Sequence, residues 1–438
     1  MAAGLDIAVV GSGIAGLSAA WLLQQRHRVT LYEAERRPGG HSNTVDVQTP
    51  AGPRSVDTGF IVYNEQTYPN LTALFAHLGV NTKASDMSFA VSLDGGHTEY
   101  AGTDLFGLFA QRRNIARPRF WSMLRDLRRF YLQAPAQARH ASPATSLGEF
   151  LAAHGYGAAF REDHLLPMAA AIWSASAMRL QDYPAAHFIR FCENHGLLKF
   201  SGRPLWRTVD GGSRNYVKRM VARIETRLGQ GVAQIRREYD CVAVRNTAGS
   251  VRRHDHVVLA CHADQALAML DDPTDAETAL LSAFGYSTNR AVLHSDATLM
   301  PKRRAAWASW NYIGRRDQAD LLHVTYWMNR LQGLPEAPPL FVTLNPAVAP
   351  RPDAVLHEET YRHPQFDAEA MRAQSGLWSL QGRQRTWFCG AYFGAGFHED
   401  GLQAGLAVAE QLGGVRRPWT VAGESKRIHL TAPELEFA

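Results

Sequence analysis

The run GSGIAG at residues 11–16 constrains the fold more than any other feature of the sequence. The apolar residues 7–10 before it have the length of a buried strand, and residues 14–25 show helical periodicity. In a strand–turn–helix unit, the first glycine permits a tight turn, the second lets the backbone approach a diphosphate, and the third lets the helix pack on the strand. We therefore expect a diphosphate at the helix N-terminus, contacted by Gly11, Gly13, Ile14, Ala15 and Gly16.

A second strand is predicted at residues 28–32, and it leads directly into Glu33 and Ala34. A carboxylate in this position accepts hydrogen bonds from ribose hydroxyls and repels a 2′-phosphate. The expected ligand is therefore an unphosphorylated adenosine diphosphate moiety. The residues of this unit leave both NAD and FAD open.

Length and charge narrow the class of protein. A chain of 438 residues is too long for one comfortable core, so two domains are expected. The net charge of +5 is too small to indicate nucleic-acid binding, but it leaves a membrane surface open as a partner. Four dispersed cysteines indicate neither a disulfide framework nor a metal site. Because we find no signal peptide and no long apolar run, we expect a cytoplasmic protein, at most peripheral on the inner face of the membrane.

The segment after the second strand carries a further signature. Arg37, Gly39 and Gly40 resemble the second motif of the flavin amine oxidase and phytoene desaturase superfamily. There the glycines bring the backbone close to the flavin diphosphate and the arginine lies beside it. The superfamily usually has Arg or Lys next, where this chain has His41. The resemblance implies FAD as the cofactor and a Rossmann-type FAD-binding domain of the amine oxidase, glutathione-reductase-like, type.

Three more motifs follow in the superfamily's order. Thr58, Gly59 and Phe60 are similar to the turn beneath the isoalloxazine ring, and Val242 lies in a strand resembling the one whose backbone meets the adenine. The closing motif resembles a helix N-terminus that points at the pyrimidine end of the ring and stabilises negative charge on reduced flavin. It implies contacts from Gly390, Glu399, Asp400, Gly401 and Leu402.

The positions of these motifs divide the chain. The FAD-binding domain is expected at residues 1–85, 204–284 and 383–418, and a discontinuous α+β substrate domain at residues 86–203 and 285–382, followed by a tail at 419–438. The predicted fold class is α/β. Helices of the substrate domain are predicted at residues 105–109, 119–132, 146–154, 164–178 and 185–198. Its strands are predicted at residues 291–294, 322–327 and 341–344.

Four residues are candidates for catalysis. The flavin motifs beside Tyr63, Asn64 and His398 place these residues near the ring. His398 is the first candidate for a proton-transfer or orienting role, with helix capping as the alternative. Amine oxidases of the superfamily carry a lysine that holds a water near the flavin, and Arg290 falls at the corresponding position. For the aromatic runs nearby, core packing is the alternative to substrate contact.

The stretches DTGFIVYN, TYWMNRLQ and GFHEDGL resemble a bacterial subgroup of predicted NAD/FAD-binding proteins. Its members are commonly found alongside cyclopropane-fatty-acid-synthase-type methyltransferases, and some relatives act in making methylated or furan-containing fatty acids. The resemblance implies hydride transfer between flavin and a fatty acyl chain of a membrane lipid, with a lipid methyltransferase as a partner. The alternatives are a flavin amine oxidase for a small amine, and an accessory protein or isomerase that works with the methyltransferase.

Residues 111–130 form a separate feature, with seven arginines and one acid interleaved with apolar and aromatic residues. A basic amphipathic segment of this kind binds anionic lipid headgroups, with its aromatics on the other face. The alternative is a solvated arginine-rich helix packed on its own domain.

Overall fold

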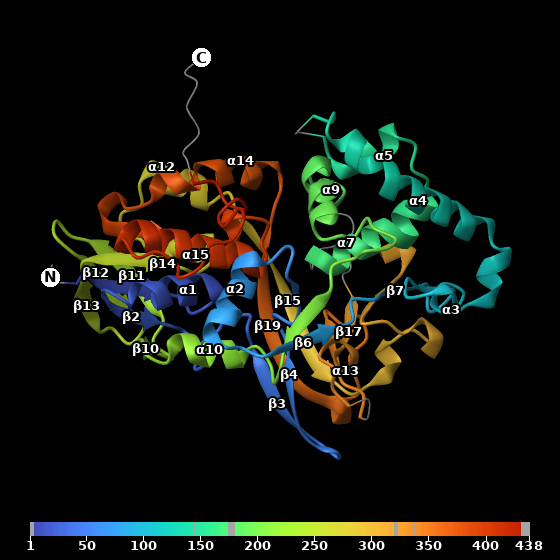
Figure 1. Cartoon of the computed structure of the whole chain (residues 1–438), viewed down its shortest axis with the longest axis horizontal. Coiled ribbons are helices and arrows are strands. Elements are labelled where there is room, and N and C mark those ends of the chain that lie inside the picture. Colours follow the sequence, from blue (N-terminus) through green and yellow to red (C-terminus); the bar gives the residue numbers. More distant parts are fainter. Residues whose placement is uncertain (1–3, 143–144, 174–179, 319–322, 336–337, 431–438) are drawn as a thin grey trace.

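The computed structural model describes residues 4–142, 145–173, 180–318, 323–335 and 338–430. A five-stranded parallel sheet lies at one end of the molecule, in the order β10-β2-β1-β14-β20 (Figure 1). Its strands are β1 (Asp6–Val10), β2 (Arg28–Tyr32), β10 (Glu225–Arg227), β14 (His256–Leu259) and β20 (Thr386–Phe388). The predicted α/β class is confirmed, and the sheet draws strands from each of the three segments expected to form the FAD-binding domain.

A seven-stranded mixed sheet forms the centre of the other half, in the order β19-β15-β18-β17-β16-β7-β8. Its strands are β7 (Phe89–Leu93), β8 (Thr98–Ala101), β15 (Gly285–His294), β16 (Trp310–Gly314), β17 (Val324–Trp327), β18 (Phe341–Leu344) and β19 (Val355–Gln365). The antiparallel pair β15–β19 passes between the two halves (Figure 1). We did not predict β19, because Tyr361 is its one buried residue and its sequence is largely polar.

Three small sheets complete the β structure. One is a hairpin, one joins β5, β9 and β6, and one is the meander β11-β12-β13. Their strands are β3 (Thr44–Thr49), β4 (Gly52–Asp57), β5 (Tyr63–Asn64), β6 (Thr82–Ser85), β9 (Trp206–Val209), β11 (Val232–Arg237), β12 (Val242–Asn246) and β13 (Val251–His254).

Helices surround both sheets. Those of the parallel-sheet half are α1 (Ile14–Leu23), α2 (Pro69–Leu78), α10 (Arg214–Val221), α11 (Ala263–Met269), α12 (Asp275–Leu281), α14 (Ala368–Gly376) and α15 (His398–Gly413). Those of the other half are α3 (Leu105–Leu108), α4 (Pro118–Ala138), α5 (Leu147–Ala153), α6 (Ala158–Phe160), α7 (Leu166–Trp173), α9 (Ala185–Asn194) and α13 (Met328–Leu331). Residues 174–178 of the helix predicted at 164–178 lie outside the described residues, as does residue 322 of a predicted strand.

Single helical turns link these elements. They are η1 (Arg112–Ala116), η2 (Arg161–Leu165), η3 (Ala297–Leu299), η4 (Arg304–Ala306), η5 (Arg316–Gln318), η6 (Pro352–Ala354), η7 (Leu377–Leu380), η8 (Arg383–Arg385) and η9 (Ala391–Phe393). None of the helices within the described ranges is long and apolar enough to cross a membrane.

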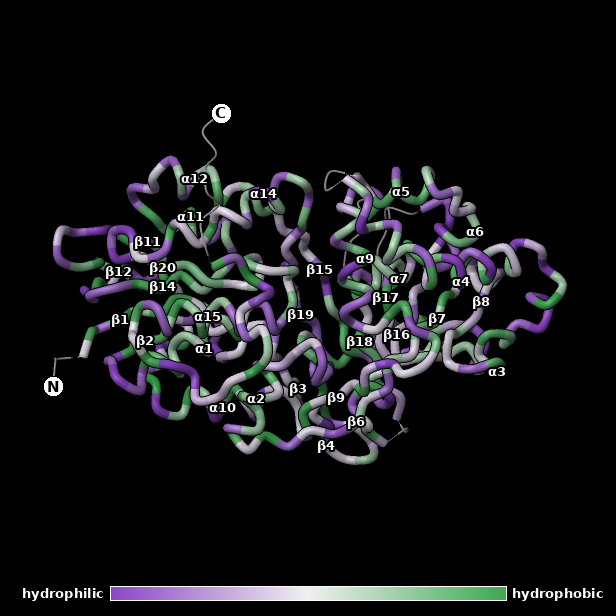
Figure 2. The backbone as a smooth tube through the Cα atoms, turned by 45° about the horizontal axis from the view of Figure 1, so that its top comes forward, coloured by the Kyte–Doolittle hydropathy of each residue, from purple (hydrophilic) through white to green (hydrophobic). Residues whose placement is uncertain are grey.

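The core of the parallel-sheet half depends on a close contact between α1 and α15. All ten residues of α1 are buried, and Figure 2 shows an apolar stretch of the tube where α1, β14 and α15 meet. A Cβ at Gly405 would lie 2.1 Å from the carbonyl oxygen of Ala15. The backbones of α1 and α15 therefore touch, and any side chain at position 405 would separate them.

Burial gives the fold an acid-sensitive set of histidines. Burial lowers the pKa of seven histidine side chains to about 3 or about 4. It also lowers the pKa of His41 well below the usual range of histidine. The seven are His164, His195, His262, His294, His323, His363 and His398. Below pH 6.5 the unfolded chain takes up protons on these side chains, whereas the folded chain stays largely unprotonated there down to about pH 4. The free energy of unfolding is therefore expected to fall as the pH drops through this window.

Burial raises the pKa of three carboxyls, to about 6 at Asp57 and above the usual value at Glu399 and Asp400, which offsets part of the effect. Urea unfolding of the FAD-loaded protein at pH 7 and pH 5 measures the balance. We expect lower stability at pH 5 than at pH 7. In His323→Phe, which removes one titrating imidazole, this difference should be smaller by about 2 kcal/mol. Equal stability at both values would contradict the prediction.

Candidate cofactor and active site

Two glycine-rich loops meet after the C-terminal end of β1. Gly11 has a φ of +98°, in the range that favours glycine. The N–H of Gly39 donates to the carbonyl oxygen and to Oγ of Ser12, both at 3.0 Å. A Cβ at Gly40 would lie 3.1 Å from Cα of Gly13. The two loops that the sequence singled out separately therefore form one structural unit.

This unit leaves room where a diphosphate is expected. A Cβ at Gly13 would meet no atom within 4 Å, and α1 begins directly after Gly13 without a side-chain cap. Unpaired N–H groups in the first turn of a helix attract phosphate. The guanidinium of Arg37 donates to the carbonyl oxygen of Gly40 at 2.7 Å, beside this space. By contrast, a Cβ at Gly16 would lie 1.9 Å from the carbonyl oxygen of Gly11, so Gly16 serves packing.

Glu33 lies against the first glycine loop, and its contact with a ribose stays a prediction. Its Oε2 accepts hydrogen bonds from the N–H of Ser12 at 2.9 Å and from Oγ of Ser12 at 2.5 Å. The exposed Ala34 follows, and a Cβ at Gly231 would lie 2.9 Å from Cβ of Ala34. The start of β11 therefore lies beside the expected position of the ribose and adenine.

The prediction for Val242 is wrong. Val242 pairs with His254 in the β12–β13 ladder, and the imidazole of His254 is bonded to the carboxylate of Asp6 at 2.5 Å. Asp6 begins β1, whereas the glycine loop follows the end of β1, so Val242 lies at the opposite edge of the sheet. The residues just before β11 lie beside the glycine loop instead: the N–H of Gln230 donates to the carbonyl oxygen of Glu33 at 3.0 Å, and Gly231 packs against Ala34.

The turn at Thr58, Gly59 and Phe60 packs on His41, which directly follows Gly39 and Gly40. The N–H of Phe60 donates to the carbonyl oxygen of His41 at 2.7 Å. A Cβ at Gly59 would lie 2.2 Å from the same oxygen, so only glycine fits. The hydroxyls of Thr58 and Tyr361 lie 2.7 Å apart, which ties the turn to β19.

Asp57, just before this turn, joins the two halves of the molecule. Its Oδ1 accepts hydrogen bonds from Oγ1 of Thr44 at 2.6 Å and from the N–H of Ser213 at 3.0 Å. Its Oδ2 accepts a hydrogen bond from Nε2 of Gln332 at 3.0 Å, at the end of α13. Burial raises the pKa of Asp57 to about 6.

The N-terminus of α15 meets that of α1. A Cβ at Gly401 would lie 3.0 Å from Cγ2 of Ile14, and one at Gly390 would lie 2.4 Å from the ring of Tyr392. The closing motif therefore converges on the diphosphate loop. Leu402 is fully buried behind this contact.

The two carboxylates of the closing motif are engaged within the protein. Glu399 accepts hydrogen bonds from the N–H groups of Asn70 and Leu71, both at 3.0 Å, and so caps α2. Oδ2 of Asp400 accepts a hydrogen bond from the N–H of Phe397 at 2.8 Å. Contact of residues 399–402 with FAD remains a prediction. Because the two carboxylates are engaged, the backbone N–H groups are the atoms expected to make it.

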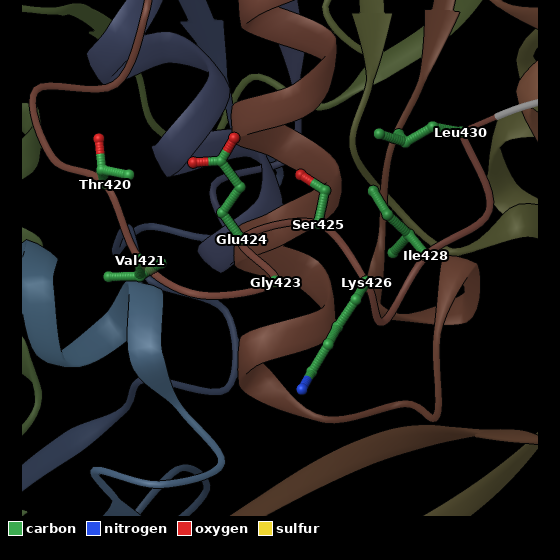
Figure 3. A pocket seen from close by; sticks show the side chains of 8 residues that line it. All are labelled: Thr420, Val421, Gly423, Glu424, Ser425, Lys426, Ile428 and Leu430. Atoms are coloured by element: carbon green, nitrogen blue, oxygen red, sulfur yellow. The ribbon is translucent and has the colours of Figure 1, made fainter.

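The tail supplies the partner of Asp400. Arg427 Nε lies 2.6 Å from Oδ1 of Asp400, and the guanidinium also donates to the carbonyl oxygen of Thr67 at 2.7 Å. Trp419 stacks on Trp21 with 5.8 Å between ring centroids. A surface hollow in this region is lined by tail residues alone (Figure 3), which are Thr420, Val421, Gly423, Glu424, Ser425, Lys426, Ile428 and Leu430. It is separate from the nucleotide loops.

His398 lies at the centre of the expected flavin-ring site. Its imidazole stacks on Phe60 at 3.8 Å between centroids, with an interplanar angle of 10°. Its Nε2 is hydrogen-bonded to the hydroxyl of Tyr216 at 2.7 Å, and that hydroxyl is bonded to Ser42. Burial lowers the pKa of His398 to about 3, so the ring is neutral at physiological pH. The sequence offered no sign of the contribution of Tyr216, which lies on a separate helix.

The other three catalytic candidates differ in their surroundings. Tyr63 is 2% exposed and packs edge-on against Phe75, as a core residue does. Asn64 is fully buried, and its Nδ2 has no partner within the described part of the chain, which leaves it free for a ligand. The prediction for Arg290 is wrong, because its half-exposed side chain forms an ion pair with Glu358 at 2.5 Å on the outside of β15.

Successive side chains of a strand point to opposite faces of the sheet. Because the side chain of Arg290 is on the outer face of β15, that of its neighbour Asn289 is on the inner face, where it is buried. Its Nδ2 is 2.8 Å from Nδ1 of His363, whose ring lies 5.2 Å from that of His41. Burial and then the neighbouring His363, His262 and His398 lower the pKa of His41 well below its usual range. This inward polar cluster was missed, because β19 had not been predicted.

These observations fit FAD. The uncapped N-terminus of α1 and the open space at Gly13 suit the diphosphate of FAD. The carboxylate of Glu33 suits the ribose, and the N-terminus of α15 at Gly401 suits the flavin ring. Within the described ranges, no group of His, Cys, Asp or Glu side chains could hold a metal ion.

Fold and site together define a flavoprotein oxidoreductase. The family model described as flavin containing amine oxidoreductase matches residues 14–313, and the chain belongs to this family. It is an FAD-dependent oxidoreductase. Among curated proteins, none matches the sequence.

Solved structures share the fold along nearly the whole chain. Putrescine oxidase bound to putrescine has a TM-score of 0.67 at 15% identity, over 93% of this chain and 99% of that one. The CLA-producing fatty acid isomerase from P. acnes has a TM-score of 0.62 at 17% identity, over 93% and 98%. Cyclohexylamine oxidase from Brevibacterium oxydans IH-35A has a TM-score of 0.62 at 15% identity, over 93% and 99%. At these identities the likeness shows the fold alone.

Two glycines of the first loop give a matched pair of variants. Gly13→Ala adds a methyl group to open space at an ordinary φ of −63°, so we expect an unchanged melting temperature without FAD but a loss of FAD affinity of about tenfold or more. Gly16→Ala places a methyl group against the carbonyl oxygen of Gly11 and lowers the melting temperature itself. Flavin absorbance per protein and thermal unfolding separate the two effects, and full FAD binding by Gly13→Ala would contradict the assignment.

The ion pair of the tail is expected to stabilise the fold. Arg427→Met leaves the buried Asp400 without its cation and should cost ~3 kcal/mol of unfolding free energy. The control is Arg416→Met, because the side chain of Arg416 is 55% exposed and its partner Glu410 keeps a second cation, Arg417. This change, which also removes the pair of Arg416 with Glu424, should cost less than ~1 kcal/mol. Adding Asp400→Asn to Arg427→Met should recover part of the loss. Denaturant unfolding measures all three, and equal costs for Arg427 and Arg416 would exclude the proposed role.

Proposed function

We propose that the protein acts on a C–C bond of a hydrophobic substrate, a fatty acyl chain of a membrane lipid, by desaturation or reduction. The observation that carries this proposal is an aromatic cluster at the start of α15, made of Phe397, Phe191, Trp173 and His195. Phe397 stacks on Phe191 at 4.7 Å between centroids, and Phe191 stacks on His195 at 3.9 Å. Trp173 lies 4.5 Å from Phe191.

The cluster joins the two halves at the point where the closing flavin motif begins. Phe397 immediately precedes His398, while Phe191 and Trp173 belong to α9 and α7 of the helical block. Phe397 and Trp173 are only partly buried, so they keep apolar surface that a substrate can cover. An acyl chain gains binding energy from such a surface in proportion to the apolar area removed from water.

The charges near the aromatic cluster disfavour a protonated amine. The neighbouring carboxylates, Asp400 and Glu399, are engaged with Arg427 and with the N-terminus of α2. Burial and then the cation of Arg427 lower the pKa of His195 to about 3, so this imidazole is neutral. At the aromatic cluster, a cationic substrate would therefore meet the cation of Arg427, while the two neighbouring carboxylates are already engaged.

His398 has an orienting role in this proposal. When bound, FAD supplies the two-electron redox chemistry of the family. The stacked Phe60 and the hydroxyl of Tyr216 fix the plane of the neutral imidazole, and Nε2 shares a proton with Tyr216. His398 thereby presents one constant face to the reacting region and adds no charge to it.

Two further points support an acyl chain. One solved structure of the same fold is named as a fatty acid isomerase, and this supports the proposal. A lipid methyltransferase is the partner class that fits the proposal, since a methylated acyl chain has to be made by methyl transfer before or after the redox step.

The direct test is anaerobic absorbance of the FAD-loaded protein. For desaturation, we expect phospholipids with unsaturated or methyl-branched chains to transfer two electrons to the oxidised flavin and bleach it. For reduction, we expect the same lipids to take two electrons from flavin that dithionite has reduced beforehand, which restores its absorbance. Putrescine and aromatic amines should leave the oxidised flavin unchanged. Bleaching by amines alone would establish the amine oxidase alternative and end the acyl-chain proposal.

A variant pair ties the reaction to the aromatic cluster. Phe191→Ala removes the ring that contacts the other three members, and should raise the lipid concentration for half-maximal bleaching about tenfold, from the lost apolar contact. Phe200→Ala is the matched control, because Phe200 is 58% exposed and lies outside the cluster. FAD content should be unchanged in both, and equal lipid dependence of the two variants would argue against the cluster as the substrate site.

A further inference from the structure

The helices α3 and α4 lie at the far end of the molecule from the parallel sheet (Figure 1). Exposed apolar side chains occur on α3, on η1 and at the start of α4. Leu105 is 72% exposed, Phe106 86%, Ile115 57% and Trp121 49%. Single exposed apolar residues are normal, but a group of them marks an interaction surface. The indole N–H of Trp121 donates to the backbone carbonyl oxygen of Ile115 at 2.8 Å, which ties the start of α4 to η1.

The outer side of α4 extends this surface. Trp121, Arg125, Arg128 and Leu132 are spaced by four, three and four residues, so they form one stripe, and all four are exposed. The ring of Phe109, at the end of α3, lies 6.0 Å from that of Trp121 and joins α3 to the stripe.

The structure corrects the sequence expectation for residues 111–130. Phe120, Met123 and Phe130 are buried in the protein's own core, so the main apolar face of α4 does not meet lipid. The alternative, a helix packed on its own domain, therefore holds for that face. The exposed apolar groups come instead from α3, η1 and the outer stripe of α4.

Positive charge accompanies these apolar groups. Within the described ranges, the exposed Arg112, Arg128 and Lys302 form no ion pair. Burial and the nearby Arg113, Arg316 and Arg303 lower the pKa of Arg117, which reflects an excess of cations there. A surface hollow next to α3 is lined in part by Arg113, Lys302 and Arg303.

We propose that this surface docks the protein on an anionic phospholipid bilayer. We call it the α3–α4 face and define it by Leu105, Phe106, Arg112, Ile115, Trp121, Arg125, Arg128 and Leu132. Apolar side chains enter the boundary between headgroups and acyl chains, and the cations contact lipid phosphates. The inference extends the proposed function, because it brings the enzyme to the acyl chains on which that function rests.

The test is co-sedimentation of the full-length, FAD-loaded protein with vesicles. The vesicles are phosphatidylcholine alone, or equal parts of phosphatidylcholine and phosphatidylglycerol, each at low and at high salt. We expect binding to the anionic vesicles, and a marked loss of binding at high salt and with phosphatidylcholine alone.

Two pairs of variants locate the surface. Leu105→Ser with Phe106→Ser should weaken vesicle binding about tenfold, through lost apolar insertion, and Arg112→Gln with Arg128→Gln should weaken it about tenfold or more, through lost charge. The matched controls lie on the opposite end of the molecule: Tyr239→Ser with Val251→Ser, and Arg223→Gln with Arg245→Gln (Figure 1). The controls should bind like the parent protein.

The proposal is overturned if the parent protein ignores anionic vesicles, or if the four variants bind equally. Flavin bleaching by detergent-dispersed lipid separates this inference from the proposed function, because it needs no bilayer. Variants of the α3–α4 face should keep that bleaching while losing vesicle binding. If the parent protein binds vesicles but lipid neither bleaches its oxidised flavin nor reoxidises its reduced flavin, the acyl-chain function is refuted and the docking surface stands.

Discussion

The contact between α1 and α15 is the constraint on which the cofactor site depends. Gly405 allows the backbone of α15 to touch the carbonyl oxygen of Ala15, and Gly401 sets the start of α15 against Ile14. Two helix N-termini that lie almost four hundred residues apart in the chain thereby point into the same region. The partial positive charge of each N-terminus suits one end of FAD, the diphosphate or the pyrimidine.

The ionisable groups around this region are compensated inside the protein rather than offered to a substrate. Asp400 is paired with Arg427, Glu399 caps α2, and the partly buried His398 is neutral and hydrogen-bonded to Tyr216. A site whose charges are already satisfied presents mainly its apolar surface. This is the physical basis for the proposal of an apolar substrate.

The sequence was most informative where a motif prescribes its own geometry. The glycine loops were predicted correctly because their spacing encodes tight turns and close approaches, as at Gly16 and Gly59. It was least informative where a residue's role depends on strand register. Val242 was placed at the wrong edge of the sheet, and Arg290 was assigned the inward position that Asn289 occupies. A shift of one residue reverses the face of a strand, and local sequence does not fix it.

By itself, the sequence determined the nucleotide-binding unit, the α/β class and the choice of FAD, because these follow from residues that are neighbours in the chain. Only the tertiary structure decided which residues surround the expected ring. Tyr216, Phe191 and Arg427 reach that region from three separate elements, and β19 brings His363 to His41. Such contacts join residues that are distant in the chain, and packing of the whole core selects them, so no local pattern records them.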